Sequence, residues 1–459
     1  MIDFAPLLQP DRGQPARTIT LLTAEGFADW LSRQSAATRA LATAQRFAAK
    51  PDTHLLLPQD GDVAVVAGVT KAASPWSLAK LAEALPEGQY RLNGAEVGAN
   101  ALGWLLGQYR FTRYRKGDDI GPRVLLTRDV AHRDEMIRLA AATAQVRDLV
   151  NTGAGDLGPA ELEAEAEALA RTHHAQLMVT SGDALARDYP MIHAVGQAAT
   201  RERAPRLIEL HWGDPAHPRI AIVGKGVCFD TGGLDIKPSA GMRLMKKDMG
   251  GAAHALALAS LVMAARLPVR LHLLIPAVEN AVSAASFRPG DVLKTRKGLT
   301  VENTNTDAEG RLILGDALTR AGEEKPELIL DFATLTGAAR VALGPDLPAL
   351  FTRTEETAAA LIAAGLERDD PCWRLPLHDG YREWLKSDVA DLQNAPANGF
   401  AGSSVAALFL DRFVGAGIDW AHFDTFAWRP AAKPGRPKGG EALGLRAAWG
   451  LLLERYGQA

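Results

Sequence analysis

Short apolar runs alternate with helical patterns in the first part of the chain. The apolar runs predict strands at residues 18–22, 53–57, 63–66 and 123–126. Between them, apolar positions at helical spacing predict helices at 24–49, 76–84 and 100–109. Alternation of this kind is typical of α/β structure, so we expect residues 1–130 to form a small N-terminal α/β domain.

A longer helical pattern follows. Met136, Leu139, Val146 and Leu149 fall on one stripe and predict a helix, within residues 131–150, that connects two domains. Beyond it, strands are expected at 177–180, 207–211, 219–223, 270–276 and 327–332, and helices at 252–265, 311–321, 356–364, 403–413 and 441–456. Near-continuous apolar strands separated by helices predict a larger α/β domain over residues 151–459, with a mostly parallel central sheet covered by helices on both faces.

Composition narrows the range of functions. A hydrophobic content of 47% with 23% charged residues is ordinary for a globular protein, and a net charge of −3 gives no bulk attraction to nucleic acid or to an anionic membrane. The best apolar stretch, residues 255–265, is too short to span a bilayer, and the N-terminus has no signal-peptide pattern. Cys228 and Cys372 show no zinc or redox spacing and suit a reducing compartment. We therefore expect a cytoplasmic protein with no membrane contact, for which nucleic acid is an improbable partner.

The run NTDAEGRL at residues 305–312 is the most informative stretch. Asp307, Glu309 and Arg311 alternate with small residues, so in an extended segment their side chains would project to one face. Two carboxylates there could hold a hard cation, with the guanidinium beside them as a fixed positive group. The alternative is a solvated turn before a helix that begins near Leu312.

A second segment, residues 222–251, places charged residues among glycines. Lys225 follows a predicted strand, at the end where open α/β sheets bind ligands. Asp230, Lys237 and Asp248 follow in glycine-rich loops, whose backbone can bend around a cation. Solvated loop charges beside tight turns are an equally good interpretation of this segment alone. The phosphate-loop, HExxH and GxSxG patterns are absent from the sequence, which disfavours nucleotide binding, that class of zinc protease and serine hydrolysis.

Taken together, these two segments resemble the leucyl aminopeptidase (cytosol aminopeptidase) family. The resemblance extends from about residue 147 to the C-terminus and includes ATLTGA at 333–338 and ADLQN at 390–394. The sequence GRPKGGE at 435–441 resembles the peptidase B-like bacterial branch of that family. The first 130 residues resemble the family only in length and pattern.

The resemblance implies a site for two divalent metal ions, with Mn or Zn as the main candidates. Asp230 and Glu309 would bridge both ions, and Asp307 would complete the more exchangeable site. Lys225, as a neutral amine, and Asp248 would complete the tighter site. Lys237 would stabilise the oxyanion as a cation, and Arg311 would hold a bicarbonate that assists proton transfer.

The implied activity is removal of N-terminal residues, leucine among them, from peptides by a water molecule that the two metals activate. The family forms homohexamers, which we expect here as well. An alternative is a DNA-binding regulatory assembly protein with secondary peptidase activity. The substrate pocket would include Met245, Thr334, Leu335, Gly337 and Phe426. Phe426, in HFDTFAW at 422–428, replaces a small alanine of many relatives and is expected to shorten the pocket.

Overall fold

The computed structural model describes residues 2–59, 61–70, 74–117 and 120–457, which form two compact units. The first unit contains Met1–Ala144 together with Ala431–Lys438, and the second contains Gln145–Pro430 with Gly439–Ala459. The segment Ala431–Lys438 belongs to the first unit because its backbone and a charged side chain make contacts there. The amide of Gly435 donates to Glu83, and the guanidinium of Arg436 lies 4.4 Å from the ring centre of Trp76.

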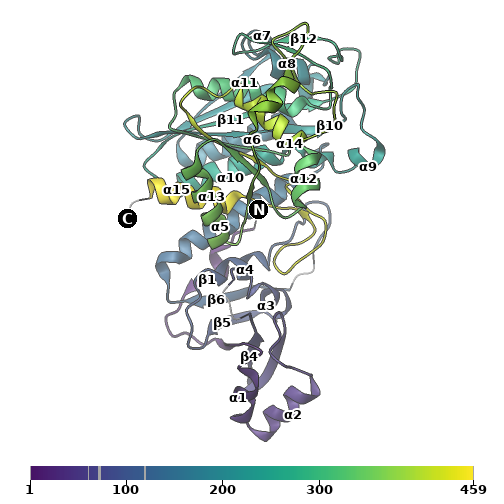
Figure 1. Cartoon of the computed structure of the whole chain (residues 1–459). Helices are drawn as coiled ribbons and strands as arrows, with labels where there is room; N and C mark the ends of the chain where they lie inside the picture. Colours follow the sequence, from purple (N-terminus) through teal and green to yellow (C-terminus); the bar gives the residue numbers. More distant parts are fainter. Residues whose placement is uncertain (1, 60, 71–73, 118–119, 458–459) are drawn as a thin grey trace. The chain divides into compact units, whose positions relative to one another are not determined.

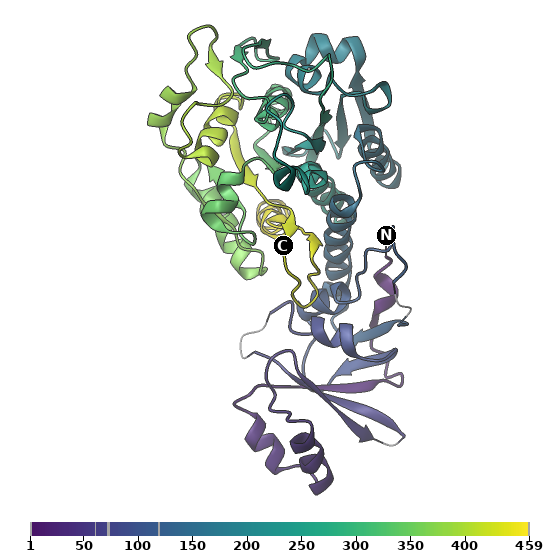
Figure 2. The same ribbon diagram turned by 90° about the vertical axis from the view of Figure 1, so that its right-hand side faces the viewer.

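The first unit is built on a six-stranded sheet in the order β1-β6-β5-β2-β4-β3, in which only the β3–β4 pair is antiparallel (Figure 2). Its strands are β1 (Leu8–Pro10), β2 (Arg17–Leu22), β3 (His54–Gln59), β4 (Asp62–Gly68), β5 (Gly88–Leu92) and β6 (Arg123–Thr127). Its helices are α1 (Phe27–Ser32), α2 (Ala36–Ala44), α3 (Ala79–Ala84) and α4 (Asn100–Leu106).

Two sequence predictions in this unit need correction. The single helix expected over residues 24–49 is two short helices, α1 and α2. Ser35 separates them, because its hydroxyl accepts a hydrogen bond from the amide of Thr38 and caps the start of α2. The strands β1 and β5 were not expected, since Gln89 and Arg91 interrupt the apolar pattern of β5.

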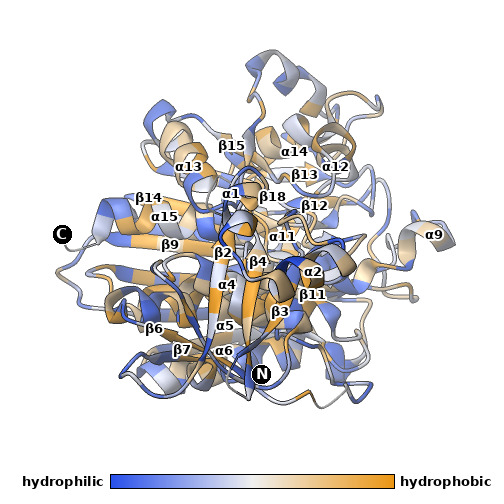
Figure 3. Cartoon of the chain, turned by 90° about the horizontal axis from the view of Figure 1, so that it is seen from below, coloured by the Kyte–Doolittle hydropathy of each residue, from blue (hydrophilic) through white to orange (hydrophobic). Residues whose placement is uncertain are grey.

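The second unit contains a larger sheet in the order β16-β15-β18-β14-β9-β11-β8-β7, with β10 paired to β11. The strands are β7 (Gln176–Ser181), β8 (Arg206–Trp212), β9 (Arg219–Gly224), β10 (Gly226–Asp230), β11 (Arg270–Asn280), β14 (Leu328–Ala333), β15 (Ala349–Thr352), β16 (Trp373–Arg374) and β18 (Asp419–Asp424). The central strands β18, β14, β9 and β11 run parallel, and of these the apolar runs predicted β9, β11 and β14 but not β18. Figure 3 shows the apolar residues along β9 and β14.

Helices cover both faces of this sheet. In Figure 1, α8, α11 and α14 lie above it, and α10, α13 and α15 lie below it. The helices of the unit are α6 (Pro159–His173), α7 (Gly182–Asp188), α8 (Pro190–Gly196), α9 (Ser239–Met242), α10 (Gly250–Ala264), α11 (Glu309–Glu323), α12 (Gly337–Leu343), α13 (Glu355–Glu367), α14 (Gly402–Asp411) and α15 (Leu445–Tyr456). A long helix, α5 (Val130–Asn151), leads into it from the first unit. The expected α/β architecture is confirmed, and α10 is buried on nearly every side, as an interior helix must be.

Short elements complete the second unit. Two small sheets contain β12 (Val292–Lys294), β13 (Thr300–Glu302) and β17 (Leu392–Gln393), and β19 (Trp428–Arg429) with β20 (Gly439–Gly440). The 3₁₀ helices are η1 (Ala5–Leu7), in the first unit, and η2 (Arg201–Arg203), η3 (Met245–Met249) and η4 (Asp379–Leu385) in the second.

Among the described residues, no helix combines the length and the apolarity that crossing a membrane requires.

Candidate metal centre and active site

The loop after β9 fixes Lys225 between a strand and a helix. Its amide donates to the carbonyl of Phe332 at the end of β14 (3.0 Å), and its carbonyl accepts from Ala252 at the start of α10 (2.8 Å). This close approach requires glycine at position 251, where a Cβ would lie 2.1 Å from the carbonyl oxygen of Phe332. The side chain of Lys225 is thereby held at the carboxyl ends of the parallel strands, where such sheets bind ligands.

The acidic run does not have the extended form that alternation suggested. Asp307 lies in a turn, and Glu309 is the first residue of α11, which begins two residues earlier than predicted. An acid at the start of a helix is favourable because the helix N-terminus carries partial positive charge. Gly310 packs directly on Lys225, since a Cβ there would lie 2.5 Å from the lysine Cε. The two informative segments are thus in contact.

Four acids and two lysines meet at this point. Lys225 Nζ lies 2.6 Å from Asp248 Oδ2 and 2.9 Å from Glu309 Oε1. Lys237 Nζ lies 2.8 Å from Asp230 Oδ2 and 2.5 Å from Asp307 Oδ1. Oxygens of Asp230, Asp307 and Glu309 lie within 4.8 Å of one another. The structure therefore brings together all five predicted metal ligands and Lys237.

The cluster carries more negative charge than its lysines neutralise. Burial, followed by the charge of Asp230, raises the pKa of Glu309 to about 8 and that of Asp307 to about 6. Glu309 is 1% exposed, and its Oε2 has no hydrogen-bond partner among the described residues. Buried carboxylate oxygens without partners are costly unless a cation binds them. The oxygen-rich donor set therefore fits divalent metal ions.

Neighbouring polar side chains hold the acids in place, a role that the sequence analysis did not predict for them. Asn280 donates to Asp230 Oδ1 (2.9 Å) and to the carbonyl of Thr306 (3.1 Å). Thr334 donates to Asp248 Oδ1 (2.8 Å). Asn394, from the ADLQN motif, accepts from the amide of Thr304 and donates to the carbonyl of Asn305. Their distance from the acids in sequence hid these contacts.

Arg311 is buried behind the cluster. Its Nη1 donates to the carbonyl of Asn394 (2.7 Å), while its Nε has no hydrogen-bond partner among the described residues. Burial lowers the pKa of Arg311 to about 10. The guanidinium does not line the cavity described next.

A cavity of about 530 Å³ opens beside the acids and contains the rest of the predicted site. The five predicted ligands and Lys237 form one part of its wall. Another part contains the residues expected to contact substrate, namely Met245, Thr334, Leu335, Gly337 and Phe426. Lys247 and Arg340 also line the cavity. The sequence analysis did not predict them, because a basic residue beside a motif is usually solvated.

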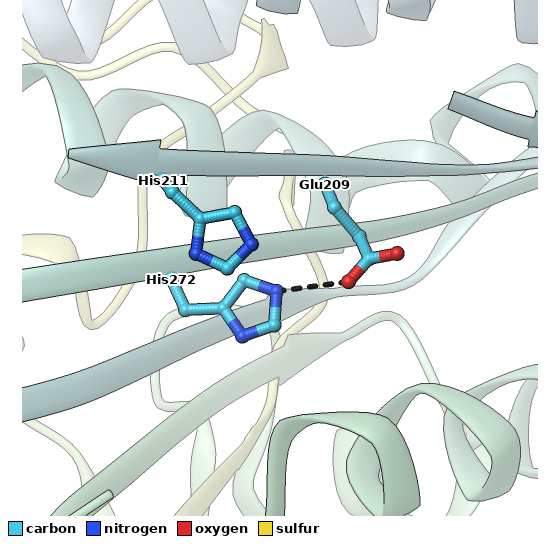
Figure 4. A group of neighbouring side chains, drawn as sticks. All are labelled: Glu209, His211 and His272. Atoms are coloured by element: carbon cyan, nitrogen blue, oxygen red, sulfur yellow. Dashed lines mark hydrogen bonds and ion pairs between the residues drawn. The ribbon is translucent and has the colours of Figure 1, made fainter. Parts of the chain in front are cut away.

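A second group of metal-type side chains, Glu209, His211 and His272, lies on β8 and β11 (Figure 4). Here the carboxylate already has partners, with Glu209 Oε1 at 3.1 Å from His272 Nε2 and 2.9 Å from Arg320 Nε. The two imidazole rings are stacked, with centroids 4.1 Å apart and an interplanar angle of 21°. Imidazole nitrogens bind a metal in the plane of the ring, so stacked rings cannot both point at one ion. We interpret this group as an ion-pair network.

Comparison with known proteins agrees with the geometry. Residues 144–448 match the catalytic domain of the Cytosol aminopeptidase family, and residues 18–126 match the M17 aminopeptidase N-terminal domain. A probable cytosol aminopeptidase of Syntrophotalea carbinolica is 41% identical over 76% of this chain and 73% of its own. One from Mycobacterium ulcerans is 40% identical over 79% and 73%.

Solved structures give the same result along almost the whole chain. The cytosol aminopeptidase of Coxiella burnetii is 46% identical, with a TM-score of 0.93 over 98% of this chain and 99% of that one. The bottromycin maturation enzyme BotP in complex with Mn is 32% identical, with a TM-score of 0.85 over 96% and 100%. The fold and the site thus define a metal-dependent exopeptidase. The chain belongs to the cytosol aminopeptidase (M17) family, and the DNA-binding alternative is not favoured.

Proposed function

We propose that this aminopeptidase uses two divalent metal ions held by the buried acids. Asp230 and Glu309 would bridge the ions, Lys225 and Asp248 would complete a tighter site, and Asp307 a more exchangeable one. The observation that carries the proposal is the set of carboxylate oxygens that converge within 4.8 Å. The side chain of Asp307 is 34% exposed, whereas that of Asp248 is 3% exposed, which supports unequal retention of the two ions.

Lys225 needs a particular condition to act as a ligand. Although burial opposes the charged form, Asp248 and Glu309 raise the pKa of Lys225, so its amine is cationic when only the acids surround it. A dication at the same acids reverses this balance, because it removes their attraction and repels an ammonium. We therefore expect metal loading to release a proton from this residue.

The ions would supply an activated water and polarise the scissile carbonyl. Lys237 would remain charged and stabilise the developing oxyanion, since its ammonium reaches into the cavity beside Asp230 and Asp307. Arg311 would hold bicarbonate for proton transfer. The Nε of Arg311, which has no hydrogen-bond partner among the described residues, supports an anion nearby, although the guanidinium is not among the groups that line the cavity.

Mn is the first metal to test and Zn the second, because Mn is bound in the structure of BotP. The N-terminal residue of a peptide would lie against Met245, Thr334, Leu335, Gly337 and Phe426, all of which line the cavity. A cytoplasmic location is supported by the buried free thiols of Cys228 and Cys372. A homohexamer is proposed from the family resemblance and is tested by light scattering.

The decisive experiment is hydrolysis of aminoacyl-nitroanilides after chelation and readdition of single metals, with metal analysis of the same samples. We expect full activity at two ions per chain, and we expect Asp307→Ala to retain one ion. Full activity with one ion per chain contradicts the dinuclear proposal. Absence of hydrolysis with every metal and substrate contradicts the aminopeptidase activity itself.

A further inference from the structure

A second cavity, of about 290 Å³, lies within the first unit. The strands β1, β6 and β5 are parallel neighbours (Figure 1), so their carboxyl ends meet at one edge of the sheet. Asp11, Arg128 and residues 93–97 follow these three strands directly and line the cavity. The neighbouring strand β2 pairs with β4 on one side and with β5 on the other, so the winding of the chain reverses between β2 and β5. Open α/β sheets bind ligands at such an edge, beside such a reversal.

The guanidinium of Arg91, on β5, lines this cavity and is only partly satisfied. Its Nη2 donates to Asp11 Oδ1 (2.8 Å) and to the carbonyl of Gln14 (2.7 Å). Its Nε is buried and has no hydrogen-bond partner among the described residues. A buried N–H without a partner costs free energy, and a ligand that accepts a hydrogen bond from it removes this cost. The unpaired donor therefore indicates that an acceptor group binds here.

The charges of the cavity are separated into a positive and a negative part. Asp11 contacts Arg91 through Oδ1, and its Oδ2 lies 4.0 Å from Nε of Arg128, so one carboxylate faces two guanidiniums. A hydrogen bond from the amide of Gly13 holds the pKa of Asp11 below its ordinary value, so this carboxylate is charged. Glu96 also lines the cavity, and it forms no ion pair with any described residue. A molecule with one negative and one positive group matches this arrangement.

The remaining part of the wall is apolar. Leu92, Val97 and Leu126 line the cavity, and each of them is at most 9% exposed. Apolar surface beside charged groups would remove a short aliphatic side chain from water, which is favourable. The volume lies near the lower end of the range for small-molecule sites, so it suits one small ligand.

We propose that this cavity binds a free amino acid with an aliphatic side chain, its carboxylate at Arg91 and Arg128 and its ammonium at Glu96. The site goes beyond the proposed function, because its lining residues all lie between positions 11 and 128 and none is a proposed metal ligand. Its ligand is nevertheless the class of molecule that an aminopeptidase releases. Phosphate and other dianions are disfavoured, because the carboxylates of Asp11 and Glu96 would repel them.

Leucine is the probe, and the metal-loaded full-length enzyme is the sample. Hydrogen-exchange mass spectrometry should show saturable protection of residues 92–97 when leucine is added. Isocaproate, which lacks the amine, and isoamylamine, which lacks the carboxylate, should not protect this segment. Absence of protection up to the solubility limit of leucine overturns the proposal. Protection by phosphate or by isocaproate as strong as that by leucine also overturns it, because the site would then be a plain anion site.

Substitutions test each charged partner. Glu96→Lys, at an exposed position, should abolish the protection by leucine and should lower the leucine bound in equilibrium dialysis by one molecule per chain. Arg128→Gln should weaken leucine binding a few-fold, because this side chain is 79% exposed and water screens its charge. Arg91→Gln should weaken it roughly tenfold, as loss of a charge-assisted hydrogen bond does. If Arg91→Gln does not fold, the two exposed positions decide the outcome.

Arg12→Gln is the matched control. Arg12 is the neighbour of Asp11 in the chain and is exposed, but it does not line the cavity. Loss of its charge should leave the affinity for leucine unchanged. Asp230→Asn, which removes a proposed metal ligand, should also retain the protection of residues 92–97, so failure of the metal proposal is distinguishable from failure of this one. Unchanged binding in Glu96→Lys, or an equal loss in Arg12→Gln and Arg128→Gln, contradicts the proposal.

Discussion

Two buried clusters of metal-ligand-type side chains in the catalytic unit, one around Glu209 and one around Glu309, have opposite electrostatics. Oε1 of Glu209 contacts both His272 and Arg320. Burial alone would raise the pKa of the Glu209 carboxyl, but these two groups lower it. At Glu309, burial and the charge of Asp230 raise the pKa to about 8, and one oxygen has no hydrogen-bond partner among the described residues. The first cluster is electrically satisfied by protein groups, and the second requires additional positive charge.

The comparison shows that ligand-type residues in proximity do not define a metal site. A metal site also needs carboxylates whose charge the protein leaves uncompensated, and lone pairs that converge on one point. The cluster around Glu309 meets the first condition through its excess of acids over lysines, and the second through the convergence of Asp230, Asp307 and Glu309. The stacked rings of His211 and His272 fail the second.

Matched acid-to-amide substitutions test this difference most strongly. Asp230→Asn removes a charge from the proposed bridge and should lower kcat/KM on the order of 10³-fold or more, with loss of bound Mn. Glu209→Gln should retain Mn and activity while it lowers thermal stability, because it breaks a buried ion pair. Metal analysis and kinetics on both proteins decide. Retention of Mn by Asp230→Asn together with loss from Glu209→Gln would reverse our assignment.

Removal of a cation from each cluster should have the next largest effect. Lys237→Ala is expected to lower kcat on the order of 10²–10³-fold with little change in KM, because an oxyanion donor acts mainly in the transition state. Arg320→Gln should lower stability and leave kcat per folded molecule unchanged. A raised KM with unchanged kcat for Lys237→Ala would instead assign Lys237 to ground-state binding.

The raised pKa of Glu309 also predicts opposite pH dependences with and without metal. In the metal-free folded protein Glu309 keeps its proton up to its raised pKa of about 8, whereas in the unfolded chain it loses the proton near its ordinary pKa of 4.5. The stability of the metal-free protein should therefore fall by about 1.4 kcal/mol per pH unit between these two pKa values. Metal must displace that proton and also the proton of Lys225, so Mn affinity should rise about a hundredfold per pH unit from pH 6 towards 8.

Thermal melts of the metal-free protein and calorimetric titration with Mn at several pH values measure both slopes. Glu209→Gln should share them with the wild type, because its cluster has no part in either. Affinity that rises only about tenfold per pH unit would show that Glu309 is already ionised before the metal binds.

The sequence predicted the α/β class from local signals, whereas the roles of the candidate site residues came from the family resemblance of two local segments. Apolar runs identify β9, β11 and β14, and acids beside glycines identify the loops at their ends. The strand β18 escaped prediction because it is polar in sequence. Its His422 pairs with the buried Asp331 of β14 at 2.6 Å, and Trp420 donates to the other oxygen of that aspartate. Only the three-dimensional pairing explains why such residues lie in a core.

The residues of the substrate region were also only partly predictable from the sequence. Phe426 was expected there from a departure from the family pattern, and it does line the cavity, although its effect on pocket length stays a prediction. Lys247 and Arg340 gave no signal, since a basic residue next to a motif is usually solvated. Their meeting at Phe426 depends on η3, α12 and the segment after β18, which are far apart in sequence.

The smallest predicted effect concerns His211, and it tests the second cluster in isolation. His211→Phe keeps a flat ring against His272 but removes both nitrogens, so stacking is retained while any ligand role is lost. If the group is an ion-pair network, the substitution should leave the Mn and Zn stoichiometry and kcat/KM unchanged. It should alter the free energy of unfolding by no more than about 1 kcal/mol, because Glu209 retains its contacts with His272 and Arg320. Zinc titration of metal-free protein, followed by metal analysis, measures this. Loss of one zinc ion per chain from His211→Phe would identify a third metal site and show that stacked imidazoles can open to bind an ion.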